Sequence, residues 1–166
     1  AKSMERYFTR WYGPGVVVSK AAEMPEQTNL FDERINVSAL GDAFRDLDDA
    51  MRATGESSRQ RARVDAMRGY LHYLVLRHRL ELAGESGKRQ AVIDAIRAET
   101  EFGGRMSDTN MIHTRALIGK AFERRFRKFL PQLEGVNTKA WRKVGTPPEA
   151  DELDRLWEAD RKLLGL

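Results

Sequence analysis

The chain of 166 residues contains no cysteine, and this absence excludes several kinds of site. Without thiols there is no disulfide, no thiolate-ligated metal and no cysteine nucleophile. Long apolar runs are missing as well. No run approaches the roughly 18 residues that a membrane-spanning helix needs, so we expect no membrane partner. No secretory signal peptide is visible either.

A strong excess of one charge is also missing. The chain has 29 basic and 25 acidic residues, a net charge of +4, whereas dedicated nucleic-acid binders carry a larger and more clustered excess. Nucleic acid is therefore not an expected partner. Hydrophobic residues make up 41% and charged residues 33%, which is typical of one globular domain covering residues 1–166. Because the sequence starts at Ala1 instead of Met, we expect this domain to be part of a longer protein.

What the sequence does contain is apolar residues at helical spacing. The clearest case is residues 111–130, MIHTRALIGKAFERRFRKFL. On a helical wheel the apolar residues fall within one stripe and the cations on the other side, which predicts a helix with a buried face and a basic, exposed face. The stripe comprises Met111, Ile118, Phe122, Phe126 and Phe129, and the basic side comprises Lys120, Arg124, Arg127 and Lys128.

Similar spacing predicts helices over about residues 3–12, 38–54, 57–83, 86–102 and 147–164. The expected N-caps are Ser38, Ser57 or Ser58, Ser86 and Thr146. Gly55 is expected to close the second of these helices, Gly103-Gly104 to stop the fourth, and Pro131 to end the helix over residues 111–130. Short connections favour antiparallel neighbours. We therefore predict an all-α bundle of five or six helices, with the helix that starts near residue 57 at its centre. The expected core comprises Phe44, Leu47, Val64, Leu71, Leu74, Ile96, Phe122 and Phe126.

Four aromatic residues lie close together near the start of the chain: Tyr7, Phe8, Trp11 and Tyr12. A short terminal helix does not need so many large aromatic side chains for its own packing. We therefore predict that they form an interaction surface covered by a parent protein or a second copy of the chain. Gly13-Pro14-Gly15 would act as a hinge behind it. Stacking on a sugar ring is an alternative use, and the competing account is that these aromatic residues are ordinary core.

A second candidate site surrounds the start of the 111–130 segment. His113 and Arg115 lie where a helix N-terminus and a guanidinium group would hold an anion. An ordinary helix cap, provided by Asp108 or Asn110, explains the same residues without a ligand. Together with Lys120, Arg124, Arg127 and Lys128, these two residues are the candidate contacts for an anion or a partner.

No pattern of residues indicates catalysis, a cofactor or a bound metal. His72 and His78 are six residues apart and fall on opposite sides of one predicted helix, which does not suit a shared metal. The carboxylates Asp46 and Asp49 share one helical face, where solvation of that face is the usual role. We therefore predict no cofactor, no metal site and no catalytic residue in this chain.

The order of three motifs resembles a known family. YFTRWYGPG supplies Trp11, Tyr12, Gly13 and Pro14; a following helix has Ala43, Leu47 and Ala50; and the long helix opens with Arg63, Val64 and Tyr70. This order resembles the helical region after the barrel in a bacterial family of unknown function related to α-glucuronidase-like glycoside hydrolases. The resemblance implies an accessory domain of a secreted or periplasmic carbohydrate-active protein. The family's catalytic carboxylates would lie on an upstream (β/α)₈ barrel, so no catalytic residue carries over.

Two functional interpretations follow. The first is a non-catalytic helical accessory or interaction domain of a carbohydrate-active protein, in contact with the parent protein, with a second copy or with a glycan. The second is a stand-alone helical module that binds an acidic protein or nucleic acid through the basic face of residues 111–130. Salt dependence separates them, because binding to phosphates weakens steeply as salt rises.

Overall fold

The structure, a computed structural model, describes residues 2, 5–6, 35–109, 112 and 115–166. Over these residues the fold is all-α and contains no strand. The elements in chain order are α3 (Val37–Ala53), α4 (Ser58–Glu85), α5 (Arg89–Arg105), η1 (Ser107–Thr109), α6 (Arg115–Ile118), α7 (Phe122–Arg125), η2 (Arg127–Leu133), η3 (Thr138–Ala140) and α8 (Ala150–Leu164). Among these residues, no helix has the length and apolar character that crossing a membrane requires.

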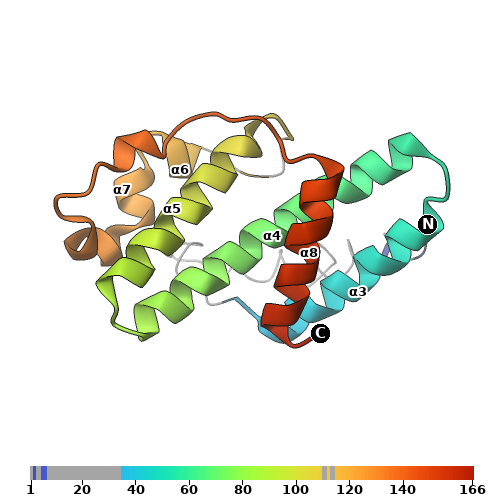
Figure 1. The fold of residues 1–166 in the computed structure, drawn as a ribbon, viewed down its shortest axis with the longest axis horizontal. Helices are drawn as coiled ribbons and strands as arrows, with labels where there is room; N and C mark the ends of the chain where they lie inside the picture. The colour runs from blue at the N-terminus through green and yellow to red at the C-terminus, as the bar shows by residue number, and fades with distance from the viewer. Residues whose placement is uncertain (1, 3–4, 7–34, 110–111, 113–114) are drawn as a thin grey trace, which may run out of the picture.

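Helix α4 is the centre of the bundle, as the sequence predicts. It runs the length of the molecule in Figure 1, with α3 and α8 against one half and α5 against the other. Residues 71–76 are buried without interruption, which is the pattern of a helix that is covered on all sides. All eight residues of the expected core are buried. The predicted all-α bundle with a long central helix is therefore confirmed.

Trp157 joins α8 to both α3 and α4. Its indole stacks on the ring of Phe44 at 3.9 Å between centroids, and the guanidinium of Arg68 lies over the same indole at 5.0 Å. Arg68 also pairs with Asp65 at 2.9 Å and with Asp154 at 2.8 Å. The stack of ring, indole and guanidinium combines apolar burial with a cation–π contact, and it sets the position of α8.

Helix α5 is longer than predicted. Gly103 and Gly104 were expected to stop it, but they are buried inside its last turn and the helix continues to Arg105. A Cβ atom at Gly103 would lie 2.1 Å from Leu117 Cδ1, and one at Gly104 would lie 2.0 Å from the carbonyl oxygen of Lys143. These glycines therefore allow close packing against α5 and do not end it.

The predicted single helix over residues 111–130 is wrong, because the structure breaks it into α6, α7 and η2. Phe122 N–H and Phe129 N–H donate to carbonyls three residues back, which is the tighter 3₁₀ pattern. Pro131, expected to end the helix, lies inside η2. It has no N–H and its ring clashes with an α-helical carbonyl four residues earlier, so 3₁₀ turns replace the helix. The predicted separation into an apolar and a basic side is still seen, since Phe122, Phe126 and Phe129 are buried and the residues of the predicted basic side are exposed.

Two of the helix ends in the first half of the fold lie where the sequence predicts them, and one cap differs. Ser57 caps α4 by accepting from Gln60 N–H, and Gly55 follows the end of α3 with a φ of +52°, both as predicted. Asn36 caps α3 in place of Ser38, because its side chain accepts from Ala39 N–H at 3.0 Å.

Two further boundaries differ from the prediction. Helix α4 ends at Glu85, two residues beyond the predicted 83, and Ser86 is its C-cap and not the N-cap of α5. Helix α8 begins at Ala150, so Thr146 does not cap it. Instead the Thr146 carbonyl accepts from Arg105 Nε at 2.9 Å, which holds this stretch along the end of α5.

Candidate functional site

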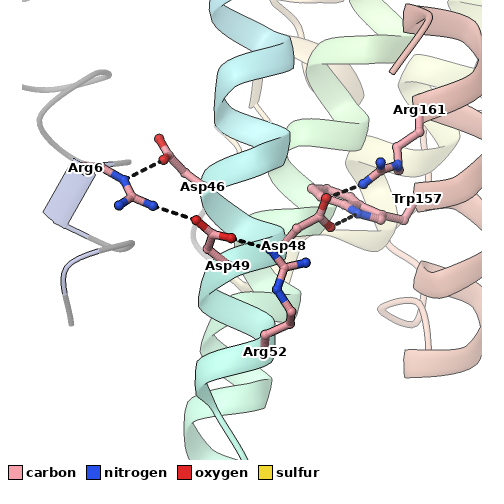
Figure 2. Close-up of polar contacts among 7 residues, drawn as sticks. All are labelled: Arg6, Asp46, Asp48, Asp49, Arg52, Trp157 and Arg161. Carbon is pink, nitrogen blue, oxygen red and sulfur yellow. Dashed lines mark hydrogen bonds and ion pairs between the residues drawn. The ribbon is translucent and has the colours of Figure 1, made fainter.

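The aromatic candidates Tyr7, Phe8, Trp11 and Tyr12 lie outside the described residues, as does the expected hinge behind them. Arg6, directly before them, is described. Figure 2 shows it reaching α3, where its guanidinium pairs with Asp46 at 3.0 Å and with Asp49 at 2.8 Å. The two carboxylates thus share one face of α3, as their spacing predicts.

Asp48, on the same helix, faces α8 instead. Its carboxylate accepts a hydrogen bond of 2.8 Å from Trp157 Nε1 and pairs with Arg161 (Figure 2). Asp49 also pairs with Arg52. Asp46, Asp48 and Asp49 therefore attach neighbouring segments to this helix.

His72 and His78 have separate partners. His72 is buried, and its Nδ1 lies 2.6 Å from Asp160, a fully buried carboxylate on α8. Arg79 Nη2 lies 3.5 Å from the other oxygen of Asp160. His78 Nδ1 is 3.4 Å from Glu81. The residues that the structure describes include no group of three or more His, Asp or Glu side chains suited to a metal ion.

Of the predicted anion contacts, His113 lies outside the described residues, and for Arg115 only the backbone is described, at the start of α6. Lys120, Arg124, Arg127 and Lys128 are all exposed, as predicted. Because the helix is broken, they follow the surface of α7, η2 and the turn before them. Elements α6, α7 and η2 pack together and against α5, so these cations belong to one part of the bundle.

Residues 115–143, here called the basic segment, account for the positive charge of the chain. They hold nine of its 29 Lys and Arg residues but only two of its 25 Asp and Glu residues, so the remainder is slightly acidic. Arg125 and Arg142 of this segment turn inward, and Arg142 lies 3.7 Å from the centre of the Phe122 ring. Over the described residues, Lys120, Arg124 and Arg127 make no ion pair. The charge clustering is visible in the sequence, but the near-balance of the total conceals it.

Sequence reasoning missed a buried polar cluster between α4, α5 and α7. Glu99 of α5 is fully buried, and its Oε1 lies 2.5 Å from Arg125 Nη2. The same guanidinium nitrogen donates to the Tyr73 hydroxyl at 3.3 Å. Burial, and then the charge of Glu99, raise the pKa of the Tyr73 hydroxyl above its ordinary value. A single Glu on an apolar helical face gives no sequence signal of such a partner 26 residues away.

This cluster borders a cleft of about 370 Å³ between the last turns of α4, the middle of α5, α7 and η2. Its apolar lining comes from Leu80, Phe126 and Phe129, and its polar lining includes Glu99, Gln132 and Lys128. The volume lies in the range of ordinary small-molecule sites. The ion pair of Glu99 and Arg125 thus borders the cleft beside its apolar lining.

Comparison with known proteins gives no match to a family model, a curated protein or a solved structure. The resemblance to the family related to α-glucuronidase-like glycoside hydrolases therefore stays a prediction that no relative supports.

Proposed function

We propose that the chain is a non-catalytic helical interaction domain that docks through its basic segment onto an acidic protein surface. The observation that carries this proposal is the set of exposed cations on α7, η2 and the preceding turn, which lack ion-pair partners among the described residues. Exposed like charges repel one another in the free domain, so an acidic partner is favoured. That surface belongs either to another chain or to another part of a longer protein.

An acidic protein suits this surface better than nucleic acid does. Proteins that bind single strands stack bases on exposed aromatic rings, but Phe122, Phe126, Phe129 and Trp141 of the basic segment are all buried. Readers of the major groove insert a longer helix, whereas α6 and α7 have four residues each. Arg124 and Arg127 offer guanidinium groups, which bind carboxylates as well as phosphates in a two-pronged geometry.

A place beside a glycan-processing domain is compatible with this proposal, since the acidic surface would then lie on that domain. Only the sequence resemblance favours it. Contact with a glycan or with a second copy through Tyr7, Phe8, Trp11 and Tyr12 likewise stays a prediction, because those residues lie outside the described part of the chain.

The test uses a fluorescent oligo-glutamate peptide as the acidic probe and a DNA duplex as its competitor. We expect the chain to raise the anisotropy of the peptide at low salt, and Arg124→Glu/Arg127→Glu to weaken this binding several-fold, since exposed ion pairs contribute ~0.2–1 kcal/mol each. The matched control is Arg59→Glu/Arg63→Glu, which changes the charge equally on exposed residues of α4. Equal weakening by both pairs would show that only net charge matters. Preferential binding of the duplex with a steep salt dependence would favour nucleic acid instead.

A further inference from the structure

The cleft beside Glu99 is a second candidate site, separate from the exposed cations that carry the docking proposal. Glu99 is fully buried, and only its Oε1 is engaged by Arg125. The other oxygen, Oε2, is buried and accepts no hydrogen bond from any described residue. Buried carboxylate oxygens are normally satisfied, because an unmade hydrogen bond to a charged group is costly. The wall of the cleft therefore contains a negatively charged residue with one hydrogen-bond acceptor that is not used.

A second unused acceptor lies in the same cleft. Gln132 of η2 lines it, and its Oε1 is buried without a hydrogen-bond partner among the described residues. Side-chain amide and carboxylate oxygens both accept N–H donors, and together they suit a group with more than one N–H. The last turns of α4, from Leu80 to Glu85, also line the cleft. The carbonyl end of a helix favours a cation nearby.

We propose that this cleft binds a small protonated alkylamine, whose N–H groups donate to Glu99 Oε2 and Gln132 Oε1. The apolar body of the ligand packs against Leu80, Phe126 and Phe129, which form the apolar lining. Lys128, which lies over the Phe129 ring at 4.9 Å, also borders the cleft. The charged lining is balanced, because it consists of three cations and three carboxylates: Arg77, Arg125, Lys128, Glu81, Glu85 and Glu99.

Binding is tested by NMR titration of the whole chain with butylammonium, following the Gln132 side-chain amide and the Gly84 backbone amide. Tetramethylammonium is the comparison, because it has the same charge and no N–H. We expect saturable shifts with butylammonium and none with tetramethylammonium. Absence of saturable shifts with butylammonium, or equal binding of both cations, overturns the proposal.

Glu99→Gln removes the charge of the acceptor, and we expect it to weaken butylammonium binding about tenfold or more, the loss typical of a hydrogen bond to a charged group. The matched control is Glu101→Gln, the same change two residues along α5 at a side chain that is 44% exposed and pairs with Arg97. Unchanged affinity in Glu99→Gln, or equal loss in the control, refutes the assignment.

Glu99→Gln also disturbs the buried partner Arg125, so a second variant keeps the test decisive if the first does not fold. Gln132→Met has similar length, lies on partly exposed η2 and replaces the whole side-chain amide, its acceptor oxygen and its N–H donors, with an apolar group. We expect a several-fold weaker affinity for butylammonium with unchanged thermal stability, and an unchanged affinity would overturn the role of Gln132. Arg124 and Arg127 do not line the cleft. A failure of amine binding therefore leaves the docking proposal intact, and a failure of docking leaves the amine-binding proposal intact.

Discussion

The same substitution, Gly→Ala, should have opposite effects in two helices of this protein. Inside a helix, alanine is favoured over glycine by about 1 kcal/mol. At Gly41 of α3 the new Cβ would meet only the side chain of Leu166, whose Cδ2 would lie 3.1 Å away, and this exposed side chain is able to move. We expect Gly41→Ala to stabilise the fold by ~0.5–1 kcal/mol.

At Gly104 of α5 the new Cβ would lie 2.0 Å from the carbonyl oxygen of Lys143, whereas ordinary carbon–oxygen contacts begin at roughly 3.3 Å. The backbone would have to move by more than 1 Å, and overpacking of this kind costs about 1–3 kcal/mol. The movement also breaks the hydrogen bond of 3.1 Å from Gly145 N–H to the Gly104 carbonyl, which contributes ~0.5–1.5 kcal/mol. After the helical gain is subtracted, Gly104→Ala should destabilise the fold by about 0.5–3.5 kcal/mol.

Urea unfolding followed by circular dichroism measures both variants against the parent chain. The expected result is a higher midpoint for Gly41→Ala and a lower midpoint for Gly104→Ala, with unchanged slopes, because neither variant alters the surface exposed on unfolding. Equal midpoints in the two variants would refute the close approach of the residue 143 backbone to α5.

Three further outcomes follow from buried or paired side chains. Leu71→Ala, at a fully buried site in α4, should cost ~2–5 kcal/mol in thermal unfolding, and no loss would contradict the central place of α4. Asp160→Ala should cost ~1–3 kcal/mol in urea unfolding, since it leaves Nδ1 of buried His72 without its hydrogen-bond partner, and an unchanged stability would contradict that pairing. The two hydrogen bonds from Arg105 lower the pKa of Glu152, so this pair should stabilise the fold above the ordinary Glu range near pH 4 and lose its effect as pH falls through the lowered value. Glu152→Gln should flatten that part of the stability–pH curve, and an unchanged curve would rule the pair out as its source.

The sequence predicts the parts of this fold that depend on local periodicity and caps. Leu71 and Leu74 identify the buried centre of α4, and Ser57 and Gly55 mark true helix ends. Gly103 was misread because a glycine that ends a helix and a glycine that admits a neighbour look alike without knowledge of Leu117. Local patterns do not contain that long-range information.

The candidate site shows the same limit. The exposure of Arg124 and Arg127 follows from their spacing to buried phenylalanines, so periodicity was enough to find it. The pairing of Glu99 with Arg125 depends on how α7 packs against α5, and the break in the predicted helix changes that packing. The cleft therefore became visible only with the tertiary structure.

The central position of α4 has a consequence for how the molecule opens. Helices α3 and α8 pack on α4 and on each other, while α5 packs on α4 and carries α6 and η2. Apart from the pair of Arg105 with Glu152, the two groups are joined mainly through α4, so we expect each to lose its packing at a lower cost than global unfolding. Amide hydrogens in the middle of α4 should therefore exchange only when the whole domain opens, whereas those of α8 and of η2 report two separate partial openings. Helix α4 would then link the two ends only in global unfolding, while each end also opens on its own.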